Sequence, residues 1–250
     1  MAVSVDTVYQ RVLAILNKEQ RGYVTPQEFN LFANQAQLDI FEQYFYDINQ
    51  FGRVPGNDTE FSDMLNILNE KINLFETNAA MTYNASFYWQ TPANLYRLGT
   101  IVYANTVTSK SLYPTPNTVV NTTTLVEAER INYNEYLMIN QSEYLKPTNS
   151  RPVFVASTAG YKVYGAAGEL ITGVACNYIK NPAEAAWGYQ MVFGEALYDA
   201  TTSVDFELHD SEETELVIKV LALAGLVVKD IQMYQIANSI ETQTTQQEKQ

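Results

Sequence analysis

The sequence predicts an α+β fold in which helices from both chain ends form one bundle and the middle forms a β-rich, sandwich-like lobe. Apolar residues recur at helical spacing near both ends. From about Phe75 to Lys180 the chain is instead rich in Thr, Tyr, Val and Asn, with short runs broken by Pro and Gly. We therefore expect N-terminal helices over 1–75, a β-rich lobe over 76–208, and C-terminal helices over 209–250 that pack back on 1–75 as one composite domain.

The first 75 residues predict three helices. Apolar spacing predicts a helix of about four turns from Val5, ended by Arg21-Gly22. In GYVTPQEF, Thr25 is placed to cap the next helix, Pro26 suits its first position and Glu28 completes a capping box. That helix is expected to run for about 25 residues. A third is expected from Thr59 to about Asn73.

The middle of the chain predicts strands separated by turns. We expect a short helix near 132–140, a hairpin that turns at Gly194, and a half-buried strand over 204–208, where apolar and acidic residues alternate. The other strands are expected near 79–83, 86–90, 100–104, 125–130, 152–157, 160–165 and 170–180.

The segment LHDSEETELVIKVLALAGLVVKD predicts the most apolar helix. Lys219 is the only charged residue from Leu216 to Val228, and these 13 positions are too few to cross a bilayer, which needs about 20. Asp210 is the expected N-cap, with Glu213 three residues on. A helix that is apolar nearly all round is buried nearly all round, either in the core of its own chain or partly by a neighbouring subunit. Further helix is expected from about Ile231 to Ile240.

Apolar stripes on this helix and on the second N-terminal helix are the candidate interface with another subunit or a partner protein. The predicted interface residues are Phe29, Phe32, Ile40, Tyr44, Val217, Val220, Leu221, Ala224 and Val228.

Composition narrows the classes of partner. The net charge of −13 argues against direct wrapping of nucleic acid, which needs clustered Lys and Arg. The 18 Tyr suit protein interfaces and sugar binding alike. A single cysteine, Cys176, allows no intramolecular disulfide, and the N-terminal residues lack a secretory signal pattern, so we expect synthesis in a reducing cytoplasm.

Catalytic patterns are sparse, and we expect no enzyme, no metal and no cofactor. His209 is the only histidine, and no nucleotide-binding glycine motif occurs. Asp205 and Glu207 share a strand face and could form a carboxylate pair for glycan hydrolysis. Tyr88 and Trp89 could stack on a sugar, although adjacent strand residues point to opposite faces, which favours one of them as core.

Three segments carry a resemblance to a known family. In order, GYVTPQEFNLFANQAQLDIFEQYF, YIKNPAEAAWGY and SVDFELHDSEETELVIKVLALAGLVVKD resemble parts of the ring or head–tail connector proteins of tailed bacteriophages, with the closest likeness to short-tailed phages of the crAss-like and related groups. The resemblance runs from about Val5 to Asp230, and it rests on composition and spacing.

The resemblance implies a non-enzymatic virion protein, assembled in the bacterial host cytoplasm. Its implied partners are further copies of itself in a ring, commonly a dodecamer, the portal protein, and other tail ring or hub proteins, with DNA passing through the lumen and no membrane. Twelve copies would carry a charge on the order of −156, which repels phosphate. The alternatives are a carbohydrate- or receptor-binding tail module and a glycan hydrolase that uses Asp205 and Glu207.

Overall fold

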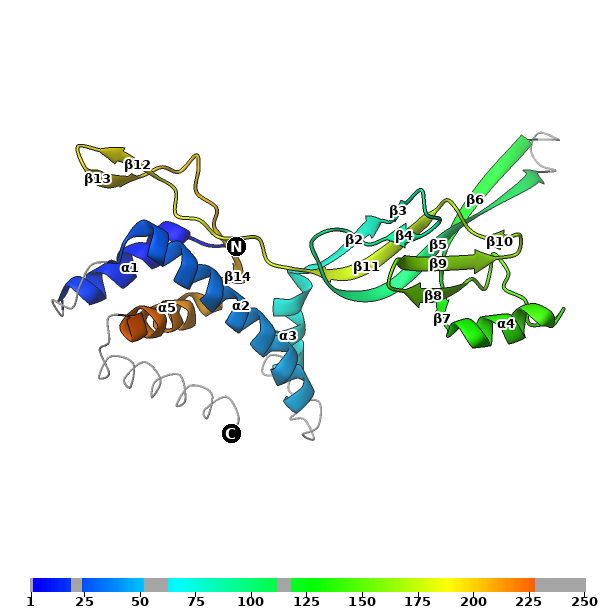
Figure 1. Cartoon of the computed structure of the whole chain (residues 1–250), viewed down its shortest axis with the longest axis horizontal. Helices are drawn as coiled ribbons and strands as arrows, with labels where there is room; N and C mark the ends of the chain where they lie inside the picture. Colours follow the sequence, from blue (N-terminus) through cyan, green and yellow to red (C-terminus); the bar gives the residue numbers. More distant parts are fainter. Residues whose placement is uncertain (1, 19–23, 52–62, 112–117, 228–250) are drawn as a thin grey trace. The chain divides into compact units, whose positions relative to one another are not determined.

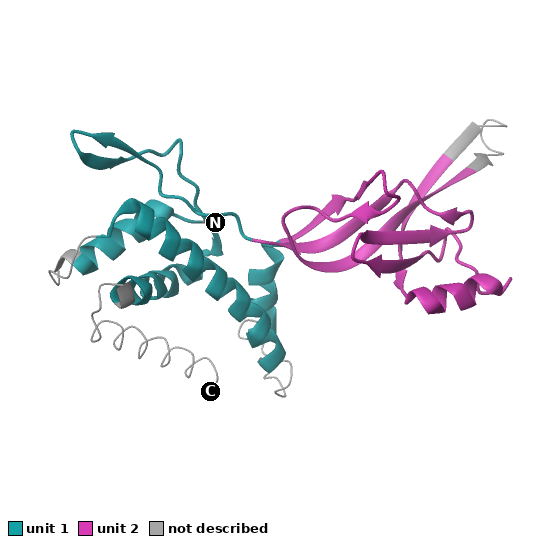
Figure 2. Ribbon diagram, in the orientation of Figure 1, with its two compact units in different colours: residues 1–75, 182–250 teal, residues 76–181 magenta. Residues whose placement is uncertain are grey.

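The chain folds into two compact units. A computed structural model describes residues 2–18, 24–51, 63–111 and 118–227 (Figure 1). Unit 1 comprises residues 1–75 and 182–250, and unit 2 comprises residues 76–181 (Figure 2). The predicted α+β class, with helices at both ends and a β-rich middle, is confirmed.

The boundary predicted at 208 differs from the observed one, because residues 182–208 belong to the helical unit. Their alternation does give strands, but these strands pair with each other or with the N-terminus of unit 1. Local periodicity predicts that a segment is extended, and it carries no information about which unit supplies the partner.

Four helices and a short 3-10 turn make up the helical part of unit 1 that the structure describes. The capping box is present: Thr25 Oγ1 accepts from the Glu28 backbone N–H at 3.3 Å, and Glu28 Oε2 accepts from the Thr25 N–H at 2.9 Å. The elements are α1 (Val5–Lys18), α2 (Pro26–Phe51), α3 (Met64–Asn73), η1 (Asp210–Glu212) and α5 (Glu213–Val227). The predicted residues 59–62, 228 and 231–240 lie outside the described ones.

The start of α5 differs from the prediction. Residues 210–212 form the 3-10 turn η1, and its N-cap is His209, whose Nδ1 accepts from the Ser211 backbone N–H at 3.3 Å. An imidazole nitrogen therefore takes the capping role predicted for the Asp210 carboxylate. The helix itself packs against α1 and α2, as its apolar surface requires (Figure 1).

Two short strands of unit 1 connect the N-terminal residues with the segment just before α5. Strand β1 (Ala2–Val3) pairs antiparallel with β14 (Phe206–His209). On β14, Phe206 and Leu208 are buried against the helices, which confirms the predicted half-buried strand. The predicted hairpin at Gly194 is also present, as β12 (Tyr189–Val192) and β13 (Glu195–Tyr198).

Unit 2 contains two sheets with an apolar core between them. One sheet has the order β3-β4-β9-β8-β7, with β10 beside β9, and the other has the order β2-β11-β5-β6. The core between them includes Trp89, Ile101, Phe154, Val163 and Cys176. The strands are β2 (Glu76–Ala80), β3 (Thr82–Tyr83), β4 (Trp89–Gln90), β5 (Leu95–Ser111), β6 (Thr118–Glu127), β7 (Glu129–Arg130), β8 (Val153–Ser157), β9 (Gly160–Gly165), β10 (Gly168–Glu169) and β11 (Val174–Lys180).

Two continuous stretches of chain pass from one sheet into the other. β2 continues into β3 through Met81, and β6 continues into β7 through Ala128, so each of these stretches pairs first in one sheet and then in the other. Strand pairing consequently runs round a continuous circuit, and this arrangement leaves few open sheet edges. Helix α4 (Tyr133–Gln141), which was predicted near 132–140, packs Tyr136 and Ile139 against the outward face of β8 and β9.

The hairpin of β5 and β6 extends well beyond the predicted strands at 100–104 and 125–130. The two strands remain paired from Val102↔Glu127 out to Ser111↔Thr118 (Figure 1). From 105 to 108 and from 121 to 124 the residues are mostly Thr and Asn with exposed or half-buried side chains, so they show no alternation for a sequence pattern to detect. Among the described residues, no helix is long and apolar enough to cross a membrane.

Candidate interaction surfaces

The structure places most of the predicted interface residues in the core of unit 1. Seven have side chains that are at most 7% exposed: Phe29, Ile40, Tyr44, Val217, Val220, Leu221 and Ala224. Phe32 is half-buried, and Val228 lies outside the described residues. α1, α2 and α5 pack against one another in the same chain, and this packing buries these seven side chains. Exposed apolar residues lie elsewhere.

The carboxylates proposed for glycan hydrolysis each hold a backbone N–H of the same chain. Asp205 Oδ1 accepts from Val5 N at 2.9 Å, and Glu207 Oε2 accepts from Ala183 N at 2.9 Å. The Asp205 bond joins the residue before β14 to the start of α1, and the Glu207 bond joins β14 to the segment that enters unit 1 at Pro182. The structure thus gives both acids a positioning role. Within the described residues, no group of three or more His, Cys, Asp or Glu could hold a metal ion.

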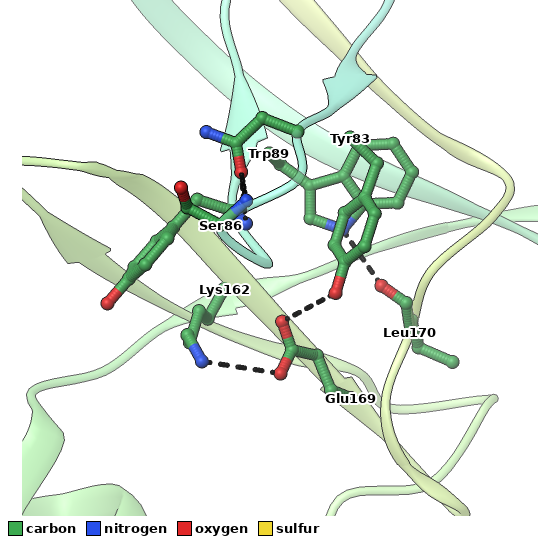
Figure 3. Close-up of polar contacts among 8 residues, drawn as sticks. Tyr83, Ser86, Trp89, Lys162, Glu169 and Leu170 are labelled. Carbon is green, nitrogen blue, oxygen red and sulfur yellow. Dashed lines mark hydrogen bonds and ion pairs between the residues drawn. The ribbon is translucent and has the colours of Figure 1, made fainter.

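In the pair Tyr88 and Trp89, the tryptophan belongs to the core of unit 2. Trp89 is buried, and its Nε1 donates to Leu170 O at 2.8 Å (Figure 3). Tyr88 lies on the other side of the strand, where the Lys162 ammonium sits 4.9 Å from its ring centroid. The prediction that one of the two is a core residue is confirmed.

A polar network holds this part of unit 2. Glu169 accepts from Tyr83 Oη at 3.1 Å and from Lys162 Nζ at 3.4 Å (Figure 3). Burial and the bond to Glu169 raise the pKa of Tyr83, so its phenol remains a donor. Because β3, β9 and β10 each contribute one of these residues, the network ties three strands together beside the turn at 84–88.

That turn carries an exposed phenylalanine in a strained backbone conformation. Phe87 has φ 65° and is 63% exposed, while Asn84 Oδ1 fixes the turn by accepting from the backbone N–H groups of Ser86 and Tyr88. A left-handed backbone is costly for a residue with a Cβ and is usually taken by Gly or Asn. Only one other non-glycine residue in the described ranges adopts it, and that residue is Phe193.

Phe193 lies at the tip of the β12–β13 hairpin in unit 1. Val192 pairs with Glu195, and the two residues between them have φ 52° (Phe193) and 90° (Gly194), as expected for a two-residue type I′ turn. The side chain of Phe193 is fully exposed, with a relative accessibility of 104%. Met191 and Leu197 are also more than 60% exposed, so the hairpin ends in an apolar tip made of Met191, Val192, Phe193 and Leu197, which we call the Phe193 tip.

Three amide side chains of α2 hold the chain that leads into this hairpin. Asn34 bonds both backbone groups of Ala185, at 2.8 and 2.9 Å, and Asn30 bonds both backbone groups of Trp187, at 2.8 and 3.4 Å. Gln37 donates to Ala183 O at 2.7 Å. These amides lie three or four residues apart on one helix face, so they reach every second residue of the extended segment 183–187. They make the backbone hydrogen bonds that a neighbouring strand would otherwise make. We call Asn30, Asn34 and Gln37 the amide ladder.

Aromatic packing fixes the base of the hairpin. Trp187 is buried, its Nε1 donates to Asp6 Oδ1 at 2.9 Å, and its ring lies 4.3 Å from that of Tyr9. Gly188 follows where the two arms approach closely: a Cβ there would lie 2.7 Å from the Thr202 carbonyl carbon and 2.8 Å from Ser203 N. The hairpin base is therefore rigidly held, while its tip makes the exposed apolar surface.

Unit 2 has a cavity of about 570 Å³ where the chain passes from one sheet to the other. The chain leaves β5 at Ala128 and pairs, as β7, with β8, so no strand in the described part of the chain pairs with the edge of β5 at Leu98–Thr100 on this side. Buried side chains of Ile101, Ala128 and Phe154 form part of the lining. Both sheets thus contribute walls to one open, partly apolar hollow.

Charged residues surround this cavity. Arg151 pairs with Glu129 at 3.5 Å, whereas Arg130 makes no ion pair within the described part of the chain. Glu127 also lies on the rim. The two arginines and two glutamates leave the rim close to neutral, with Arg130 as its available cation.

The negative charge of the chain belongs almost wholly to unit 1. Its sequence has 8 Lys and Arg against 22 Asp and Glu, a net charge of −14, whereas unit 2 has 7 against 6, a net charge of +1. The two values account for the −13 of the whole chain. Contacts between unit 1 of one molecule and unit 1 of another are consequently disfavoured by charge.

No known family model matches the sequence, and no curated protein matches it.

Proposed function

We propose that the protein is a non-enzymatic structural component of a phage virion that assembles with itself into a ring between the portal and the tail. The observation that carries this proposal is the Phe193 tip, an apolar surface held out from unit 1 on a firmly anchored hairpin. An aromatic residue that is exposed at a conformational cost suits an anchor for a protein contact. The ring and the contact with the portal are proposed from the resemblance of the sequence to connector proteins.

Further exposed surface supports a role in broad protein contacts. In unit 2, α4 has no buried residue, and beyond Tyr136 and Ile139 its apolar side chains face solvent, with Met138 74% exposed. The long β5–β6 hairpin is lined by Thr and Asn, which suit polar contacts at interface rims. Carbohydrate binding has weaker support, because Trp89 is buried and is not available to stack on a sugar.

The ring would let DNA pass without holding it. Unit 1 carries a net charge of −14, and twelve copies would form an assembly that repels phosphate at close range. Retention of duplex DNA by the purified protein at physiological salt would contradict this part of the proposal.

The test is reconstitution with the portal protein encoded by the same phage genome. We expect the full chain to bind portal rings and to appear in electron micrographs as an added ring on one face of the portal. Immunogold labelling of purified virions should place it at the head–tail junction. A protein that neither binds the portal nor occurs in virions would refute the proposal.

A further inference from the structure

We infer that the Phe193 tip of one molecule docks into the cavity between β5, β7 and β8 of a second copy of the same chain, with Glu195 placed beside Arg130. This inference rests on the self-association in the proposed function and specifies the two surfaces that meet. The contact joins two different patches, so it is head-to-tail, the kind of contact that generates rings when the rotation closes.

The turn chemistry indicates that Phe193 serves a contact outside its own unit. A type I′ turn needs positive φ at both central positions, and Asn-Gly is the sequence that favours it most. Here Phe-Gly occupies those positions, and the left-handed backbone of Phe193 is less stable than that of Asn would be. The ring is fully exposed, so burial within the chain offers no compensation for that cost.

The tip projects and is apolar, and the cavity is open and partly apolar. The tip presents Met191, Phe193 and Leu197 on a projecting turn, and the cavity offers about 570 Å³ lined in part by Ile101, Ala128 and Phe154. The hollow is lined by both apolar and charged residues, so it can take an aromatic ring and a charged neighbour together, and an aromatic side chain that fills a hollow is a common centre of an interface.

Charge selects the second copy as the occupant. Unit 1 of one molecule repels unit 1 of another, at −14 each, whereas unit 2 carries +1 and is the surface of the chain that an acidic unit can approach. At the contact itself, Glu195 is the charged residue of the turn, and Arg130 is the cation of the rim without an ion pair in the described residues. Glu127 on the same rim has the opposite effect, so the role of Arg130 must be tested directly.

The test measures self-association of the full chain by sedimentation velocity at concentrations up to roughly 0.1 mM. Phe193→Asn removes the aromatic ring and gives the turn its favoured Asn-Gly sequence, so the hairpin should stay folded. We expect self-association to weaken at least about tenfold. Phe87→Asn is the matched control, since Phe87 is also an exposed phenylalanine with positive φ, and it should leave self-association unchanged.

Charge-reversal variants test whether the tip docks at the cavity rim that carries Arg130. Glu195→Lys and Arg130→Glu should each weaken self-association, and the double variant should restore it toward that of the natural chain. The inference is overturned if the natural chain stays monomeric, if Phe193→Asn associates normally, or if the double variant is no better than the single ones. A chain that associates through Phe193 and Arg130 but does not bind the portal would contradict the proposed function and leave this inference standing.

Discussion

Lys71 and Glu212 form an ion pair in the interior of unit 1. Glu212 is 4% exposed, and the Lys71 ammonium, which reaches it from α3, also lies 5.5 Å from the centroid of the Tyr44 ring. Removing the lysine leaves a carboxylate buried without its cation. We therefore expect Lys71→Met to lower the free energy of unfolding by about 3 kcal/mol, measured by urea denaturation.

Two further variants test whether the loss of stability comes from the unpaired buried carboxylate or simply from the loss of one ion pair. Lys71→Met combined with Glu212→Leu should recover most of the loss, because a buried pair can be replaced by apolar residues at little net cost. Arg11→Met breaks the pair with Glu213 at 2.9 Å, where the arginine side chain is 53% exposed, and should cost less than about 1 kcal/mol. Equal losses in Lys71→Met and Arg11→Met would refute the account.

Single residues show what sequence reasoning can and cannot assign. The Thr25–Glu28 capping box follows from residues three positions apart, and it is present as predicted. The predicted interface residues Val220 and Leu221 are buried by their own chain, a result that depends on how α5 meets α1 and α2. Phe193 was not among the predicted sites. A Phe-Gly pair at the centre of a predicted hairpin was the available signal, and it becomes meaningful only when φ and exposure are known.

At the scale of elements, α4 is joined to its sheet by stacked tyrosines. Tyr136 of α4 lies on Tyr164 of β9 with ring centroids 3.9 Å apart. Burial, together with the phenols of Tyr136 and Tyr133 and the Glu169 carboxylate, raises the pKa of Tyr164 to about 12. In the unfolded chain the phenol ionises near its ordinary value of about 10.

The sign of the pH dependence follows from these two values. Between about pH 10 and 12 the unfolded chain loses the Tyr164 proton and the folded chain keeps it, so this contribution to stability is complete below pH 10 and is lost as the pH rises toward 12. We expect Tyr164→Phe to lose less unfolding free energy between pH 8 and 11 than the natural chain, in urea titrations. Tyr144→Phe, at a 99% exposed position, should behave like the natural chain. An identical alkaline loss in all three proteins would contradict the prediction.

Elements with a local signal were predicted, and elements defined by distant partners were not. The Gly194 hairpin and the helix near 132–140 are present, because turn and capping residues specify them nearby. The outer part of the β5–β6 hairpin was missed, since residues 105–108 and 121–124 are exposed or half-buried and are mostly Thr and Asn without alternation. The amide ladder was also missed. The spacing of Asn30, Asn34 and Gln37 is that of an ordinary polar helix face, and only the structure shows that segment 183–187 packs against it.

On the scale of the whole molecule, unit 2 is an insertion into unit 1 between Phe75 and Pro182. The two ends of the insertion are neighbours, because Glu76 on β2 pairs with Ile179 on β11. Antiparallel partners lie about 5 Å apart, so a short linker can span the gap that removal of unit 2 would leave. Each unit also has its own core: Phe75 packs on Phe41 in unit 1, and Ile101 belongs to the core between the sheets of unit 2.

We therefore expect the two units to fold separately. A chain in which roughly four Gly and Ser residues replace 76–181 should keep a helical circular dichroism spectrum and a cooperative thermal transition, and residues 76–181 alone should give a β-type spectrum with a transition of their own. Charge provides a second readout, since unit 1 at −14 should bind an anion-exchange resin at neutral pH and unit 2 at +1 should pass through. Loss of the cooperative transition in either fragment would show that the core of one unit depends on the other. The separated fragments would then allow the proposed docking of the Phe193 tip to be measured as binding between unit 1 and unit 2, which Phe193→Asn should weaken as it does in the full chain.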